Sequence, residues 1–210
     1  EKIEVVYQGC DPIFKKDSSE QEKQAVLKKY DLPAEFILSV GTIEERKNLL
    51  QLINALPGLN YDIKLVVVGR QTAYFNKVKQ AIDLHHIANR VIFLNSVSFD
   101  ELPALYQSAK IFVYPSRYEG FGIPVLEALC SGVPVIAATG SCLEEAGGPC
   151  SQYAAPDDVD GLAEKLNLVL GDEGLRQKMI AEGREYSANF DDKILAGQMF
   201  DIYKNILQNA

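Results

Sequence analysis

The sequence predicts an α/β fold, a Rossmann-like doubly wound parallel sheet of about six strands with helices on both faces. Short β-branched apolar runs alternate along the chain with longer segments of helical periodicity. The apolar runs are nearly continuous, which is typical of strands buried on both faces. A length of 210 residues and an apolar fraction of 47% suit a single domain with a substantial core.

The expected elements follow one another along the chain. Strands are expected over residues 36–41, 63–69, 91–94, 110–114, 134–138 and, as a short sixth, 151–154. Helices are expected over residues 47–56, 72–84, 98–109, 124–130, about 161–170 and 193–208. Ser98 and Glu101 have the spacing of a capping box, and Asp157 or Asp158 is expected to cap the helix near Gly161.

Charge and composition argue against several functional classes. The chain carries 21 Lys and Arg against 29 Asp and Glu, a net charge of −8, and lacks a basic run, so nucleic acid is not an expected partner. No run of about 18 apolar residues would span a membrane. No secretory leader pattern is visible.

The cysteines and histidines do not predict a metal site. None of Cys10, Cys130, Cys142 and Cys150 form a C-x-x-C pair, and no histidine lies at a ligand-like spacing from them. Cys130 is expected in the core, because its neighbours are apolar. The adjacent residues His85 and His86 are expected at the surface or partly packed.

The segment from Glu119 to Glu127 is the strongest candidate for a functional motif. Gly120 and Gly122 allow the backbone to approach a ligand closely, and Pro124 suits the first turn of a helix. A helix N-terminus after such a loop can bind phosphate. Glu127 lies among apolar neighbours, where a carboxylate needs a partner such as a sugar diol. A structural glutamate paired with an arginine would explain the same pattern.

Arg46 and Lys47 are the second candidates. They follow the strand over residues 36–41 and stand where a helix is expected to begin. Cations at a helix N-terminus oppose the helix dipole, so helix stability does not explain them, whereas binding of a diphosphate does. Two solvated residues that balance Glu44 and Glu45 are the alternative explanation.

Two further loops are weaker candidates. Gly69 and Arg70 follow the second strand, and residues 139–148 form a glycine-containing acidic loop after the fifth. Ligands of such sheets bind beyond the carboxyl ends of the strands, where these loops lie. The chain has neither the G-x-G-x-x-G motif after its first strand nor a Walker-type motif, which argues against a nicotinamide dehydrogenase and a P-loop enzyme.

Taken together, these segments resemble the carboxyl-terminal lobe of retaining glycosyltransferases with the GT-B fold, in the group that shares the glycosyl transferase group 1 domain. The resemblance covers nearly the whole chain. It rests on residues 6–11 with Phe14, residues 40–48, residues 65–69, residues 100–106 and the two-glutamate motif within residues 116–132. The pair Glu119 and Glu127 has the E-x7-E spacing of that family.

The resemblance implies a role for each candidate residue. Arg46, Lys47 and Glu119 would be catalytic, the two cations neutralising a diphosphate leaving group and Glu119 holding the donor sugar. Glu127 would bind the ribose hydroxyls and the backbone near Val97 the base. The remaining donor-binding residues would be Gly41, Arg70, Gly120, Phe121, Gly122 and Ile123. The resemblance implies a nucleotide-sugar donor, no cofactor and no required metal.

The resemblance also implies what lies outside this chain. Residues 1–14 would form a hinge segment, and the helix within residues 190–210 would cross to an amino-terminal acceptor lobe, which would explain the apolar stripe of Leu195, Met199, Ile202 and Ile206. A single lobe is expected to bind donor without transferring sugar. The expected location is cytoplasmic, with peripheral association at the inner membrane face allowed.

Some residues depart from the family pattern. Gln8 and Cys10 replace the more usual Asn and Val in the hinge segment, and the loop over residues 139–149 is atypical, with Cys142 followed by Glu144 and Glu145. Donor sugar, base and acceptor therefore stay open. A nucleotide-sugar epimerase or phosphorylase-like enzyme and a non-catalytic interaction module remain the alternatives.

Overall fold

The computed structural model describes residues 3–208 and contains one six-stranded parallel sheet. The strands are β1 (Phe36–Val40), β2 (Lys64–Val68), β3 (Val91–Leu94), β4 (Ile111–Tyr114), β5 (Val135–Ala138) and β6 (Gln152–Ala154). Their spatial order is β3-β2-β1-β4-β5-β6. From β1 the sheet is extended first toward β3 on one side and then toward β6 on the other, so the strand order reverses between β1 and β4. Doubly wound sheets bind ligands at such a switch point.

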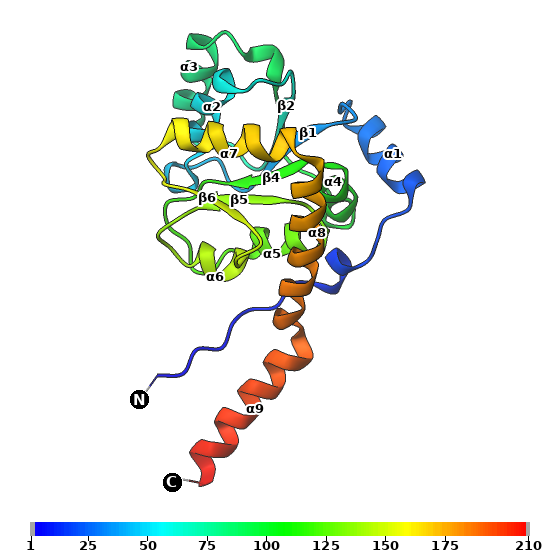
Figure 1. The fold of residues 1–210 in the computed structure, drawn as a ribbon, viewed down its shortest axis with the longest axis vertical. Coiled ribbons are helices and arrows are strands. Elements are labelled where there is room, and N and C mark those ends of the chain that lie inside the picture. Colours follow the sequence, from blue (N-terminus) through cyan, green and yellow to red (C-terminus); the bar gives the residue numbers. More distant parts are fainter. Residues whose placement is uncertain (1–2, 209–210) are drawn as a thin grey trace.

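Helices cover both faces of the sheet (Figure 1). They are α1 (Glu20–Lys29), α2 (Leu49–Ala55), α3 (Phe75–Leu84), α4 (Leu102–Ser108), α5 (Ile123–Cys130), α6 (Leu143–Gly147), α7 (Val159–Gly171), α8 (Glu173–Ser187) and α9 (Asp192–Gln208). The 3-10 turns are η1 (Pro12–Lys15), η2 (Glu45–Lys47), η3 (Leu56–Gly58), η4 (Ala88–Arg90), η5 (Phe99–Glu101) and η6 (Ala188–Phe190). The predicted fold class is therefore confirmed.

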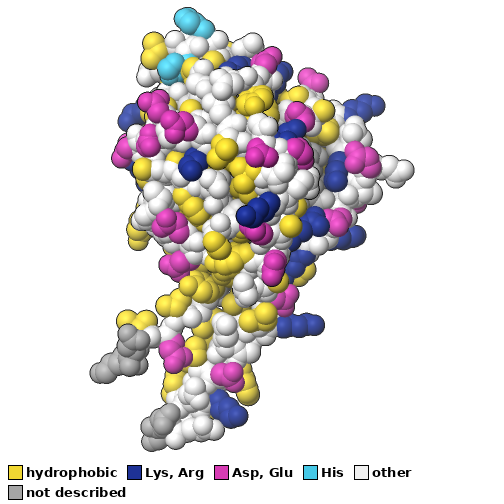
Figure 2. All heavy atoms as spheres, viewed as in Figure 1, with side chains coloured by type: hydrophobic (Ala, Val, Ile, Leu, Met, Phe, Trp, Pro, Cys, Tyr) yellow, Lys and Arg dark blue, Asp and Glu magenta, His cyan; other side chains and the backbone are white. Residues whose placement is uncertain are grey.

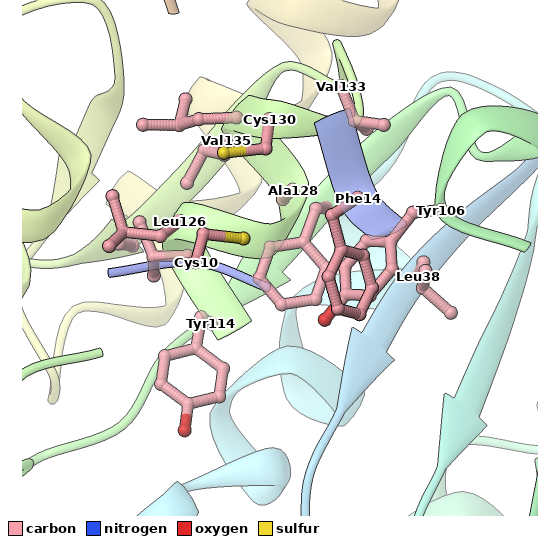
Figure 3. Packing of buried hydrophobic residues seen from close by; sticks show 14 of the residues in the cluster. Cys10, Phe14, Leu38, Tyr106, Tyr114, Leu126, Ala128, Cys130, Val133 and Val135 are labelled. Carbon is pink, nitrogen blue, oxygen red and sulfur yellow. The ribbon is translucent and has the colours of Figure 1, made fainter. Parts of the chain in front are cut away.

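Alternate residues of each strand enter two separate cores. Leu38 and Phe112 face a cluster with α1, α4, α5 and α6, whereas Ile37 and Ile111 face a cluster with α2, α3 and α7. In the first cluster, Phe14 of η1 packs edge-on against Tyr106 of α4 at 5.7 Å between ring centroids (Figure 3). Both faces are buried, which is why the strands are continuously apolar.

Several predicted helix starts are wrong. The helix expected from Lys47 begins at Leu49, because Asn48 takes a left-handed conformation with φ 54° and separates it from η2. The expected capping box fails, since the Ser98 hydroxyl caps nothing and η5 precedes α4. The helix expected from Thr72 starts at Phe75. Asp158 caps α7, accepting a hydrogen bond from the N–H of Gly161 at 2.8 Å.

The cysteine and histidine predictions can be compared directly. Cys130 is buried at 7% exposure, as expected, and the four cysteines are free thiols. His85 is half-buried and His86 exposed. Within residues 3–208 no three His, Cys, Asp or Glu side chains cluster as metal ligands would. No helix in that range is both long and apolar enough to cross a bilayer.

The final helix extends away from the body of the molecule (Figure 1). Within the described residues 192–208, Leu195 is the one buried side chain, and Met199, Phe200, Tyr203 and Ile206 are exposed. Apolar side chains gather on the surface where the body meets this helix (Figure 2). Of the predicted apolar stripe, Leu195 is buried and Ile202 half-buried, whereas Met199 and Ile206 are exposed.

Candidate functional site

The candidate site lies at the carboxyl ends of β1 and β4, where two loops face each other. The loop after β1 is bound to the end of β2 and the residues that follow it. The N–H groups of Gly41 and Ile43 donate to the carbonyls of Val68 and Arg70, at 2.8 and 2.9 Å. Gly69 must be glycine, because a Cβ there would lie 1.9 Å from the Gly41 carbonyl oxygen. The loop after β4 is bound to the β1 loop by the N–H of Arg117 and the carbonyl of Arg46, at 2.9 Å.

Arg46 and Lys47 occupy the short turn η2, which Asn48 anchors. The buried Asn48 side chain donates to the Gln51 side-chain oxygen at 2.9 Å and to the Pro156 carbonyl at 2.8 Å. Its left-handed backbone ends η2 and lets α2 start in a new direction. The two cations therefore extend from a fixed 3-10 turn toward the β4 loop, and they precede the first turn of α2.

Glu119 forms ion pairs with both cations. Its Oε1 lies 2.7 Å from Lys47 Nζ, and its Oε2 lies 2.8 Å from an Nη of Arg46. Oε1 also accepts hydrogen bonds from Ser116 Oγ at 2.6 Å and from the Tyr114 hydroxyl at 3.1 Å. Burial raises the pKa of Glu119, but the hydrogen bonds from Lys47 and Ser116 and the nearby positive charges outweigh it and hold this pKa below its ordinary value.

Tyr114, the last residue of β4, connects Lys47 with Glu119. Lys47 Nζ donates to the Tyr114 hydroxyl at 2.5 Å and lies 4.9 Å from the ring centroid. The ring packs in the core, whereas its hydroxyl points away from the neighbouring apolar side chains (Figure 3). Burial and the negative charge of Glu119 raise the pKa of Tyr114, so the phenol stays neutral and keeps its proton for Glu119.

A cavity of about 650 Å³ opens beside this cluster. It is lined by residues 5–8, residues 119–124, Lys47, Tyr114, Cys142 and Glu145. Gly122, with φ 120°, turns the chain into α5, so the start of this helix borders the cavity. The cavity can therefore present the Lys47 ammonium, the carboxylates of Glu119 and Glu145, and a helix N-terminus to one ligand.

Glu127 lies one helical turn further along α5 and is half-buried. It accepts a hydrogen bond from the fully buried hydroxyl of Tyr106 at 2.9 Å. Burial raises the pKa of Glu127, the Tyr106 hydrogen bond lowers it, and the charge of Asp11 raises it; the net direction is upward. The partner of this carboxylate is thus a tyrosine, and no arginine ion pair to Glu127 occurs among the described residues.

Five of the predicted residues do not line this cavity: Gly41, Arg46, Arg70, Val97 and Glu127. Arg70 is exposed at the end of β2, and Val97 is half-buried on the connection between β3 and η5. Neither lines the cavity beside Glu119. Gly41 borders a smaller pocket together with Lys47 and Tyr114.

Several residues of the site were not expected from the sequence. Tyr114 and Ser116 bind Glu119, and the Tyr7 hydroxyl donates to Glu145 at 2.8 Å across the cavity. Tyr7 also stacks on Phe121 with 5.2 Å between centroids. A hydroxyl at the end of an otherwise apolar strand was the one local indication for Tyr114.

Comparisons with known proteins agree on one family. The model of glycosyl transferases group 1 matches residues 19–186. O-antigen chain mannosyltransferase B of Escherichia coli is 33% identical over 184 residues, which cover 85% of this chain and 48% of that protein. Glycogen synthase of Mycobacterium tuberculosis is 32% identical over 177 residues, covering 81% and 42%. The chain thus spans about half the length of these curated relatives, or less.

Solved structures share the fold. A glycosyltransferase from Rickettsia africae has a TM-score of 0.90 at 24% identity, with 100% of this chain and 58% of that one covered. HepE of Anabaena, solved in complex with UDP and glucose, has a TM-score of 0.87 at 21% identity, covering 96% and 57%.

Proposed function

Because this chain belongs to the glycosyl transferases group 1 family, whose model matches residues 19–186, we propose that it is the donor-binding lobe of a glycosyltransferase. The enzyme would transfer a sugar from a nucleoside-diphosphate sugar to an acceptor. The observation that carries the proposal is the convergence of Arg46, Lys47 and Glu119 beside the start of α5.

In this proposal Arg46 and Lys47 bind the diphosphate. The reaction breaks the bond between the anomeric carbon and the diphosphate oxygen, and the diphosphate leaves with the bonding electrons. Preorganised cations and backbone N–H groups are most effective where charge grows in the transition state. Lys47 is held in place by Tyr114, and Arg46 donates to the Tyr118 carbonyl at 2.8 Å.

The remaining roles rest on the family resemblance. Glu119, with the backbone of Gly120, Phe121, Gly122 and Ile123, would hold the donor sugar, and Glu127 would accept hydrogen bonds from the ribose. Gly41 would let the diphosphate approach the β1 loop. The backbone at Val97 would meet the base, and Arg70 would lie at its edge. We assign no metal to the reaction, because the family resemblance implies none.

Retention of anomeric configuration is part of the proposal and rests on the family resemblance. A retaining transfer would place the acceptor hydroxyl on the same face of the sugar as the leaving diphosphate. The acceptor site would lie in a second lobe, to which the apolar side of α9 and the hinge segment would connect this one.

Thermal unfolding with UDP, GDP, ADP, CDP and NAD tests donor binding and identifies the base. A ligand at 100 times its dissociation constant adds about 2.7 kcal/mol, a melting shift of about 5–10 °C in a chain of this size. We expect one nucleoside diphosphate to give such a shift, and Lys47→Met to abolish it. Lys178→Met is the matched control, since Lys178 is an exposed residue of α8 that pairs with Glu182 at 3.7 Å and with no other acidic side chain within residues 3–208. No shift with any diphosphate would contradict the proposal.

A further inference from the structure

The two cations of the candidate site are already neutralised by side chains of this chain. Arg46 pairs with Glu44 at 2.7 Å and with Glu119 at 2.8 Å, and Lys47 pairs with Glu119 at 2.7 Å. Two positive charges thus face two negative ones, so the cluster offers little net attraction to a diphosphate while Glu119 stays in place. Glu119 and a diphosphate are alternative partners for the same N–H groups.

Glu119 is suited to exchange those partners. Its Oε1 is also bound by Ser116 Oγ and the Tyr114 hydroxyl, which are neutral donors on buried residues. Among the described residues its Oε2 pairs with Arg46, and Glu119 itself lines the cavity. If Arg46 and Lys47 turn to a diphosphate, Ser116 and Tyr114 still hold Oε1, and Oε2 is left to accept hydrogen bonds from a ligand.

A sugar beside the diphosphate supplies the hydroxyls that the displaced carboxylate needs. A buried ionised carboxylate without partners is costly, so displacement of Glu119 is favourable only when such donors replace the cations. A nucleoside diphosphate without its sugar lacks these donors. Glu119 then competes with the diphosphate for Arg46 and Lys47.

We propose that Glu119 is an internal counter-anion of the diphosphate site, which makes the site bind a sugar nucleotide more tightly than the nucleoside diphosphate left after transfer. This inference rests on the proposed donor-binding function. It adds a reason for selectivity between the two ligands and for release of the product. When the sugar has been transferred, Glu119 pairs again with Arg46 and Lys47 and displaces the nucleoside diphosphate. Ser116 and Tyr114 act as positioning residues for this exchange.

The test compares Glu119→Gln with the unchanged chain in calorimetric titrations of matched pairs: UDP and UDP-glucose, GDP and GDP-mannose, ADP and ADP-glucose. The amide keeps the shape of Glu119 and removes its charge. We expect the substitution to tighten binding of the nucleoside diphosphate by about tenfold and to weaken binding of the sugar nucleotide, so that the preference for the sugar nucleotide is lost.

Glu44→Gln is the matched control. It removes the other carboxylate that pairs with Arg46. Among the described residues this carboxylate forms no hydrogen bond or ion pair with Lys47, Ser116 or Tyr114, and the Glu44 backbone carbonyl, which accepts from the Lys47 N–H at 3.1 Å, is kept in the variant. A general electrostatic effect should therefore change both affinities alike and leave their ratio unchanged. Tyr114→Phe keeps the ring and is expected to weaken sugar-nucleotide binding more than diphosphate binding, a change of ratio that a purely structural role would not give.

The outcomes separate this inference from the proposed function. If the unchanged chain binds one of these pairs and Glu119→Gln weakens both ligands equally or changes neither, the counter-anion role is wrong and donor binding stands. If the unchanged chain binds no nucleotide, both proposals fail. Circular dichroism and the melting temperature of each variant confirm that it is folded before its affinity is compared.

Discussion

At the scale of single residues, Glu127 combines a structural cost with a proposed binding role. Its folded-state pKa lies above the ordinary glutamate value of 4.5, chiefly because it is buried. The folded state therefore favours the protonated form. The stability that this group contributes is fully present below the ordinary pKa and is lost as pH rises through the folded-state pKa.

Replacing Glu127 with glutamine should separate these two effects. Glu127→Gln is expected to raise the free energy of unfolding at neutral pH relative to the unchanged chain and to weaken nucleoside-diphosphate binding by about tenfold. Urea unfolding between pH 4 and pH 8, with titration of the selected diphosphate, measures both. Glu164→Gln on the exposed side of α7 is the control. A variant that is less stable at neutral pH, or that binds as before, would contradict the assignment.

The residues of the site differ in how far the sequence could predict them. Arg46, Lys47, Glu119 and Glu127 were identifiable because each is a charged residue in a loop that follows an apolar strand, or within an apolar helix, where local structure alone does not explain the charge. Tyr114 was not, because a tyrosine ending an apolar strand is equally typical of a core residue. Its hydroxyl acquires a role only when the loops after β1 and β4 meet in three dimensions.

At the scale of elements, the turn into α5 depends on one of its two glycines. A Cβ on Gly122 would lie 2.7 Å from Leu143 Cδ2 and 3.2 Å from the Ala146 Cβ, and its φ of 120° is unfavourable for other residues. A Cβ on Gly120 would meet no atom within 4 Å, and its φ is outside the positive region. Packing of α5 against α6 therefore requires glycine only at position 122.

Alanine substitutions should reproduce this asymmetry. Gly122→Ala is expected to lower the free energy of unfolding by about 2–4 kcal/mol, because backbone strain and overpacking add. Gly120→Ala is expected to change it by less than about 0.5 kcal/mol. Chemical denaturation of both variants measures the difference. Equal losses would show that loop flexibility, and not the contact with α6, sets the requirement.

Strands were predicted more reliably than helix starts, for a physical reason. Continuous apolar runs fix a buried strand almost by themselves, and each predicted strand lies within two residues of the observed one. Capping boxes depend on surroundings: Ser19 and Glu22 form one at α1, a helix that the sequence analysis did not assign. Ser98 and Glu101 have the same spacing but form no capping box. The Glu101 carboxylate instead accepts hydrogen bonds from Lys29 and Tyr30.

At the scale of the whole molecule, the doubly wound class follows from the sequence but the strand order does not. The strand order depends on which strand each new strand pairs with after its crossover helix. Packing between residues far apart in the chain decides that pairing. The return from β3 to β4 across β2 and β1 brings the loop of Glu119 against the loop of Lys47, 72 residues earlier. The candidate site is therefore a product of topology more than of any single motif.

The remaining prediction concerns what this chain does alone. It holds the proposed donor groups but spans only about half the length of its curated relatives. Its amino-terminal segment and α9 leave apolar side chains such as Val5, Met199 and Phe200 exposed. We expect the 210-residue chain to bind its nucleoside diphosphate and to transfer no sugar above background, because an acceptor must be oriented against the anomeric carbon for reaction. Release of diphosphate and labelling of oligosaccharide primers, followed with the sugar nucleotide selected by the binding assays, measure this. Lys47→Met provides the background for both assays. Robust turnover by the chain alone, abolished by that substitution, would mean that the acceptor site lies within these residues.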